Sequence, residues 1–291
     1  MSKKIFLFEK IIIGYCWLMS AIIIFAGRPF AQYTDELIFY LSISTLTMML
    51  TYYIDVDKNR LNKAIRYFYP AIMFSFFYTM TGGQMFLLFD SFYDWQLTSF
   101  ELALFGCNPT LYIDKNLLHV WLNEIISFCY FSYYFMIPVF MISVFVKKDY
   151  KILASFISST CIMFFSSYML FFLYPIEGPR WHFVSQFQNT IDGPFFRQAV
   201  EFVIANGAVR GGCMPSSHFG VALVIWMYCF KYYRRAAYII LPIVIGLGVG
   251  TVWGRFHYVS DLFVGGLIGF IGTIIIWKYE KNLVNLKYNE V

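Results

Sequence analysis

Long apolar runs, separated by short polar segments, dominate the chain. Eight of these runs approach or exceed the ~20 residues that a helix needs to cross a membrane core of roughly 30 Å. Backbone polar groups cannot stay unpaired in lipid, so we predict helices. The strict two-residue alternation of a membrane barrel is absent from the sequence. The predicted spans are 5–27, 36–54, 67–89, 120–146, 152–175, 214–230, 236–253 and 257–277.

The composition supports a membrane protein. Hydrophobic residues make up 59% of the 291 residues and charged residues only 13%, whereas a soluble domain carries about 25% charged residues. No polar block is long enough to form a soluble domain. We therefore predict an all-α integral membrane protein, a bundle of about eight transmembrane helices.

The basic residues are unevenly divided between the two sides of this bundle. Of the 22 Lys and Arg residues, 16 lie at one side and 6 at the other. The positive-inside rule then places both termini in the cytoplasm. These residues form short clusters beside the spans and not one continuous patch, so we do not predict binding of nucleic acid.

Two of the four histidines meet at the outer side. His218 begins the sixth span and His257 the eighth, so the two are 39 residues apart in sequence but reach the same membrane surface. Arg180 lies at the outer end of the fifth span, and Arg255 lies two residues before His257. Two histidines and two arginines therefore gather at one level, on the side where basic residues are scarce.

The spacing of His257 and Asp261 suggests a functional pair. Residues four apart share one face of a helix. An aspartate that accepts a hydrogen bond from one ring nitrogen fixes the tautomer and leaves the other nitrogen free to attack. The alternative is a solvated helix cap, because an aspartate near a helix N-terminus is favourable without any chemistry.

The motif MPSSHFG at 214–220 adds hydroxyl and N–H groups to the same surface. Ser216 and Ser217 stand at a predicted helix start, which is a ready anion site. The planar guanidinium groups of Arg180 and Arg255 suit phosphate oxygens; the alternatives are a capping serine and arginines that snorkel to headgroups. Together the set predicts phosphoryl transfer through a phosphohistidine, in which a second histidine protonates the leaving oxygen.

Three short motifs, GPRW, PSSH and GRFHYVSD, resemble those of the type 2 phosphatidic acid phosphatase superfamily of membrane lipid-phosphate enzymes. That family carries an Arg motif, a Pro-Ser-Gly-His motif and an Arg…His-x-x-x-Asp motif. The resemblance implies that His257 is the nucleophile, that Asp261 orients it and that His218 is the general acid. It also implies a reaction that needs no metal ion and no cofactor.

The match departs from the family pattern at four positions, one of which is Trp181, which follows Arg180 where the family has Pro. Leu173 stands where the family has Lys, Ser217 replaces Gly, and Thr251 stands where the common third motif has Arg. These departures resemble the branch that includes inositol phosphorylceramide synthases, as does an amphipathic interfacial segment near 95–118. The resemblance implies a six-helix catalytic core in 65–291, preceded by two transmembrane helices in 1–64.

We expect a lipid phosphatase that hydrolyses a phosphomonoester or pyrophosphate at the outer leaflet of the membrane. Its expected partners are a lipid phosphate substrate and the bilayer. One alternative is a lipid phosphotransferase of the inositol phosphorylceramide synthase type, in which a lipid alcohol replaces water. A weaker alternative is a transporter without catalytic activity.

Other polar residues on the outer side receive plainer interpretations. Cys107 and Cys213 lie in outer loops and could pair in an oxidising compartment. No Cys or His pair has the spacing of a zinc site, so we predict no metal centre. We expect Asp90, Asp94 and Glu101 to form a hydrated outer face.

Overall fold

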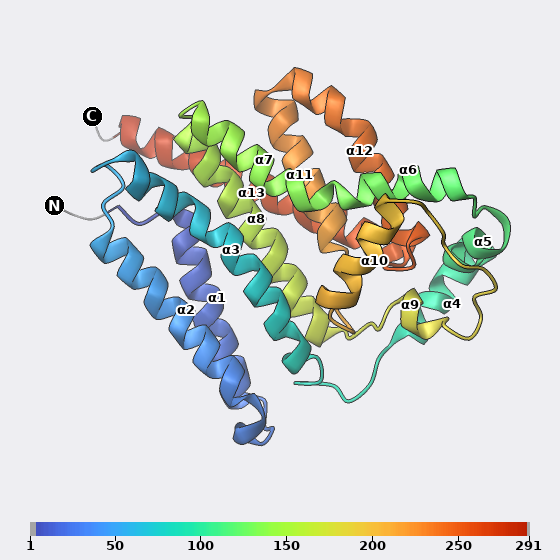
Figure 1. The fold of residues 1–291 in the computed structure, drawn as a ribbon. Helices are drawn as coiled ribbons and strands as arrows, with labels where there is room; N and C mark the ends of the chain where they lie inside the picture. The colour runs from blue at the N-terminus through green and yellow to red at the C-terminus, as the bar shows by residue number, and fades with distance from the viewer. Residues whose placement is uncertain (1–3, 290–291) are drawn as a thin grey trace.

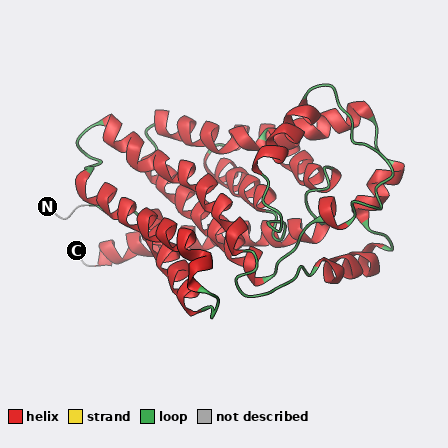
Figure 2. Ribbon diagram, turned by 60° about the horizontal axis from the view of Figure 1, so that its bottom comes forward, coloured by secondary structure: helices red, strands yellow, loops and turns green. Residues whose placement is uncertain are grey.

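The structure is a computed structural model that describes residues 4–289, with side chains described for residues 4–29 and 31–281. Its helices form an elongated bundle with a cluster of short helices at one end (Figure 1). The described residues contain no β-strand (Figure 2), and one isolated bridge pairs Ile176 with Gly212. The helices are α1 (Leu7–Phe25), η1 (Phe30–Tyr33), α2 (Thr34–Tyr53), α3 (Arg60–Gln84), α4 (Asp94–Phe105), α5 (Pro109–Asn116), α6 (Val120–Phe131), α7 (Tyr133–Val146), α8 (Tyr150–Leu173), α9 (Pro179–His182), α10 (Phe196–Gly207), α11 (Ser217–Tyr232), α12 (Arg234–Trp253) and α13 (Val259–Asn289).

All eight predicted spans lie mainly in helices, and five segments within the described part are long and apolar enough to cross a membrane. These are α1, the continuous α6–α7 segment, α8, α12 and α13 up to Lys281. Helices α2 and α3 fall outside this set, as does α11, which has only 16 residues. The chain is therefore an all-helical, multi-pass membrane protein, and the predicted count of eight spans is not confirmed.

The N-terminal helices are joined to α3 by a buried ion pair. Arg66 donates to both oxygens of Glu9 at 2.6 Å, and both side chains are at most 1% exposed. The same guanidinium donates to the carbonyls of Ile54 and Lys4, and the carboxylate also accepts from the N–H of Phe6. Every oxygen of this buried carboxylate thus has a partner, as a buried charge requires.

Glycines bring α11 and α13 into close contact. A Cβ atom at Gly265 would lie 2.2 Å from the carbonyl oxygen of Ser216, and one at Gly269 would lie 2.7 Å from that of Gly220. Small residues allow helix backbones to approach in this way in a membrane. The N–H of Ser216 donates to the carbonyl of Asp261 at 3.0 Å, so the first turns of the two helices lie side by side.

Short helices cover this end of the bundle. Helices α4, α5, α9 and α10 lie together at the right of Figure 1, next to the start of α6. Helix α4 exposes large apolar side chains and buries Asp94 and Glu101. Its exposed apolar residues are Trp95, Phe100, Leu102, Leu104 and Phe105. An apolar face of this kind suits the boundary between headgroups and acyl chains.

Candidate active site

His257 and Asp261 meet at the turn between α12 and α13. The Nδ1 atom of His257 lies 3.4 Å from Oδ2 of Asp261, and both side chains are buried. His257 precedes α13, so the turn before the helix makes this contact and not one helix face alone. The carbonyl of Thr251 accepts from the N–H groups of Phe256 and His257 and holds that turn in place. Since Nδ1 faces the carboxylate, Nε2 is the nitrogen left for chemistry.

His218 stands opposite this pair, in the first turn of α11. Its ring centroid lies 5.9 Å from that of His257. The hydroxyl of Tyr130 lies 3.4 Å from its Nε2 atom, and the ring of Tyr133 lies 4.4 Å away. Its Nδ1 atom has no hydrogen-bond partner within the described residues. His257, held by Asp261, and His218, held by Tyr130 and Tyr133, therefore face one common space.

That space is a cavity of about 60 Å³. A single water needs roughly 10–15 Å³ by this kind of measure, so several waters or one small polyatomic anion fit. Three of the site residues predicted from the sequence line it, namely Arg180, His218 and His257. The remaining lining is largely aromatic and apolar, with one acid: Tyr78, Tyr130, Glu177, Trp181, Ile204, Ala208, Val209, Gly212, Cys213 and Phe256.

The two arginines predicted to bind phosphate have different surroundings. Arg180, on the short helix α9, lines the cavity and donates to Glu201 at 3.0 Å. Arg255 lies outside the cavity lining, where its Nη2 atom donates to Asp114 at 2.5 Å and to the carbonyl of Asn189 at 2.6 Å. Arg180 is therefore the cation that is placed to meet an anion between the histidines.

Ser216 and Ser217 lie at the start of α11, as predicted, but both are buried and neither lines the cavity. The hydroxyl of Ser216 accepts from the N–H of Phe219 at 3.4 Å and caps the helix. This capping role is one of the two interpretations that the sequence left open.

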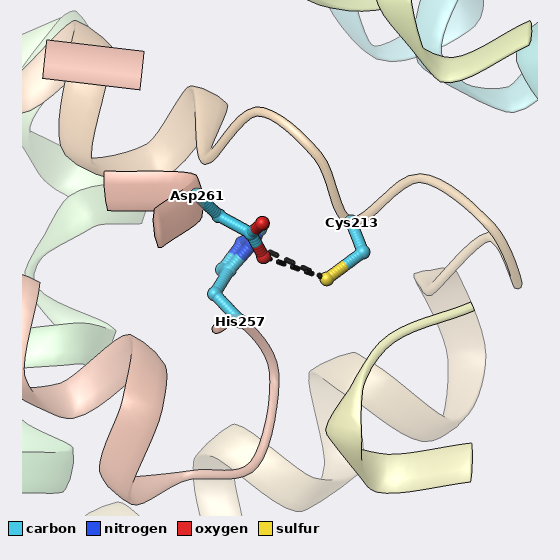
Figure 3. Close-up of side chains that lie close together, drawn as sticks. All are labelled: Cys213, His257 and Asp261. Carbon is cyan, nitrogen blue, oxygen red and sulfur yellow. Dashed lines mark hydrogen bonds and ion pairs between the residues drawn. The ribbon is translucent and has the colours of Figure 1, made fainter. Parts of the chain in front are cut away.

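Cys213 is a site residue that sequence reasoning missed. Its Sγ atom lies 2.9 Å from Oδ2 of Asp261 and 3.8 Å from Nδ1 of His257 (Figure 3). All six cysteines are free, so Cys107 and Cys213 are not paired. Burial, with the neighbouring carboxylate of Asp261, raises the pKa of Cys213 well above its usual range, which keeps the thiol protonated and able to donate. The only sign of this role in the sequence is that Cys213 stands two residues before Pro215, where the PSSH motif begins.

Cys213, His257 and Asp261 also form a set of possible metal ligands. Their donor atoms all lie within 4.8 Å of one another, and the three side chains are buried. Sulfur, imidazole nitrogen and carboxylate oxygen are all accepted by zinc. The spacing along the sequence had given no sign of this group, because Cys213 lies 44 residues before His257.

The prediction that Asp94 and Glu101 form a hydrated face is wrong. Both are buried, at 2% and 1% exposure, while Asp90 is exposed and pairs with Arg28. The carboxylate of Asp94 accepts from the N–H groups of Glu177 and Gly178 at 2.7 and 2.9 Å. It thereby holds the loop that leads into Arg180.

Asp94 also reaches the residue next to the proposed nucleophile, since it accepts from the hydroxyl of Tyr258 at 2.8 Å. Glu101 accepts from the N–H and the hydroxyl of Ser260 at 2.8 and 2.7 Å, beside Asp261. The carboxylates are buried because the first N–H groups of a helix and those of tight loops need acceptors.

Two further carboxylates hold the loop between α9 and α10 and the start of α10. Asp114 accepts from the N–H of Gln188 at 2.8 Å and from Arg255. Glu124 accepts from the N–H groups of Phe195, Phe196 and Arg197 at the start of α10. The outer loops therefore rest on a framework of buried carboxylates that comes from α4, α5 and α6.

A family comparison agrees with this geometry. The model of the PAP2 superfamily matches residues 96–275, which is more than half of the chain and includes every site residue described above except Tyr78 and Asp94. The chain belongs to the PAP2 superfamily. Membership supports a phosphatase-type or phosphotransferase-type activity, and members are in general phosphatases. No curated protein and no solved structure gives a significant match to this PAP2 superfamily member.

Proposed function

We propose that this PAP2 superfamily member is a membrane lipid phosphatase. It hydrolyses a lipid phosphomonoester or pyrophosphate at the outer leaflet through a phosphohistidine intermediate. One observation carries the proposal: two histidines with ring centroids 5.9 Å apart face one cavity, which Arg180 also lines. A nucleophile, an acid and a cation around a space for one small anion are the parts that phosphoryl transfer requires.

In the first half of the reaction, Nε2 of His257 attacks phosphorus and the bond from phosphorus to the lipid oxygen breaks. His218 gives its proton to the leaving oxygen. Arg180 balances the charge on the non-bridging oxygens, and Asp261 accepts from Nδ1 while the imidazole becomes positive. The 3.4 Å contact of Nδ1 with Asp261 supports this assignment of the two nitrogens.

In the second half, a water enters where the lipid oxygen left. His218, now neutral, takes a proton from this water, whose oxygen attacks phosphorus. The bond from Nε2 to phosphorus breaks, and phosphate leaves. The predicted phosphate-binding roles of Ser216, Ser217 and Arg255 stay predictions, because these side chains lie outside the cavity lining.

The second candidate is a lipid phosphotransferase. The aromatic lining formed by Tyr78, Tyr130, Trp181 and Phe256 favours it, because an apolar wall disfavours water and suits a lipid alcohol. A transferase must overcome water at ~55 M, which positioning can achieve since effective molarities reach ~10⁵–10⁸ M. We place hydrolysis first because superfamily members are in general phosphatases.

The test is a product analysis of the purified protein with a panel of lipid phosphates and pyrophosphates, with and without diacylglycerol or ceramide. Free phosphate released in the absence of an acceptor supports the phosphatase. Headgroup transfer that requires the acceptor, with no free phosphate, selects the transferase. If no lipid in the panel yields either product, both the phosphatase and the transferase are contradicted.

The outer-leaflet assignment rests on the uneven division of basic residues. Ser185 lies in the loop after Arg180 and Lys58 lies between α2 and α3, and both are exposed. In intact cells, a membrane-impermeant thiol reagent should label Ser185→Cys and leave Lys58→Cys at the level of the parent protein. The opposite pattern would place the site on the cytoplasmic side.

A further inference from the structure

The carboxylate of Asp261 is held by a thiol as well as by the histidine that it orients. We propose that Cys213 is a positioning residue of this site, whose S–H group fixes the Asp261 carboxylate so that His257 presents Nε2 to the cavity. This inference rests on the proposed function, because the value of the position lies in the attack by His257.

The distances around Asp261 support this role. Oδ2 lies 2.9 Å from Sγ of Cys213 and 2.8 Å from the N–H of Tyr258, but 3.4 Å from Nδ1 of His257. Oδ1 has no hydrogen-bond partner within the described residues. The two shorter contacts come from the thiol and the backbone, so they set the direction of the carboxylate and the imidazole follows it.

The thiol itself has little freedom. Its other near acceptor is the carbonyl of Phe256 at 3.3 Å, but one S–H bond can serve one acceptor well, and the carboxylate is both nearer and charged. Close to the thiol lies Gly178, where φ is +97° and an added Cβ would lie 3.0 Å from Sγ. The isolated bridge between Ile176 and Gly212 holds the segment before Gly178 against the segment before Cys213.

This packing connects the loop that leads into Arg180 with the pair of His257 and Asp261. Gly178 contacts Cys213, Cys213 contacts Asp261, and two residues after Gly178 the side chain of Arg180 lines the cavity. When a reacting group is displaced from its proper position, much of the rate enhancement that comes from positioning is lost. Loss of the thiol should therefore slow the chemical step more than it weakens substrate binding.

The test compares three variants of the full-length protein in the lipid phosphate assay. Cys213→Ala removes the donor, and we expect kcat to fall roughly 10- to 100-fold, up to the loss that a misplaced reacting group can cause, with KM changed by less than about twofold. Cys213→Ser keeps a donor of similar size and should recover most of kcat. Cys107→Ala makes the same change at a half-buried free cysteine in another outer loop and should leave both constants unchanged.

A second readout does not depend on turnover. Diethyl pyrocarbonate modifies a neutral imidazole nitrogen, and mass spectrometry follows its reaction at His257. The rate at His257 should fall in Cys213→Ala and recover in Cys213→Ser, because a well-placed carboxylate on Nδ1 makes Nε2 a better nucleophile. Thermal unfolding of each variant shows whether it is folded.

The inference is overturned if folded Cys213→Ala keeps the kcat and the His257 reactivity of the parent protein. It is also overturned if Cys213→Ser loses as much as Cys213→Ala, since the hydrogen bond would then not be the cause. If Cys213→Ala does not fold, Cys213→Ser decides alone, and a loss of kcat there counts against the thiol's role as a replaceable donor. A parent protein without activity on any lipid would contradict the proposed function, while the reactivity of His257 would still decide the role of Cys213.

Discussion

The buried acid of α1 and the two buried acids of α4, at opposite ends of the molecule, find their partners in different ways. Near the N-terminus, Glu9 and Arg66 form one closed ion pair that joins α1 to α3. Around the cavity, the buried carboxylates of Asp94 and Glu101 instead accept hydrogen bonds mainly from backbone N–H groups and hydroxyls. The first arrangement ties helices together, whereas the second fixes the loops that carry the site.

This difference predicts separate consequences for the two regions. Removing one partner of a buried ion pair leaves the other charge uncompensated, which costs stability. Removing a carboxylate that positions a loop leaves the helices in place but moves the groups that react. Substitutions at the N-terminal pair should therefore act on folding, and substitutions around the cavity should act on turnover.

The largest effect is expected at His257. His257→Ala removes the only protein atom that bonds to phosphorus in the proposed mechanism, so turnover should fall to background while the protein remains folded. The measurement is phosphate release alongside a thermal unfolding curve. Near-normal turnover in this variant would show that another residue is the nucleophile.

His218→Ala should have the next largest effect. General acid–base catalysis is typically worth ~10²–10⁴-fold, and kcat should fall by that factor. In kcat/KM, which reports the first half of the reaction, leaving groups that need no proton should show a smaller loss, so a series of phosphoesters with leaving groups of different pKa measures the role directly. An equal loss of kcat/KM across the series would contradict the assignment of His218 as the acid.

Arg66→Ala should lower the free energy of unfolding by about 3–5 kcal/mol, the usual cost of leaving a buried partner charge unpaired. The folded fraction should keep its kcat. Arg60→Ala, at the exposed start of the same helix, is the matched control and should change stability far less. A variant that folds normally but is inactive would contradict the separation of the two regions.

Asp94→Ala should show the opposite pattern. It removes the acceptor for the N–H groups of Glu177 and Gly178 and for the hydroxyl of Tyr258. The loop that carries Arg180 and the residue next to His257 then lose their support, and because a misplacement of about 1 Å can cost roughly 10²-fold in rate, kcat should fall roughly tenfold or more. The exposed Asp90 provides the control in Asp90→Ala. Loss of stability without loss of kcat would make Asp94 a purely structural residue.

The smallest effect is expected from metal removal. In the proposed mechanism Arg180 and the hydrogen-bonded histidines perform the reaction, so prolonged treatment with EDTA should leave kcat unchanged. A loss of activity that Zn²⁺ restores in the parent protein, but not in Cys213→Ser, would instead assign Cys213, His257 and Asp261 as a metal centre.

The sequence predicted the parts of this molecule that depend on local pattern. Apolar run length gave the helices, and the four-residue spacing suggested the contact between His257 and Asp261. It did not reveal Cys213, because the partners of this residue come from the turn before another helix, more than 40 residues away. Such contacts depend on how helices pack, which no local pattern encodes.

Charged residues were the least predictable class. Asp94 and Glu101 read as hydrated acids beside an apolar face, but the N–H groups they accept from belong to residues more than 80 positions away. Arg66 lies between the second and third predicted spans, on the side where basic residues are plentiful, yet it is buried against Glu9. A charge is buried when the fold supplies its partners, and the partners are visible only once the fold is known.

The most direct test of the central claim is to trap the intermediate. The purified protein is mixed briefly with a lipid phosphate labelled in its phosphoryl group, quenched in alkali and digested for mass spectrometry. We predict an acid-labile phosphoryl group on His257, absent from His257→Ala and more abundant relative to turnover in His218→Ala, where water is activated less well. A phosphoryl group on any other residue, or turnover with no trapped intermediate on His257, would contradict the account.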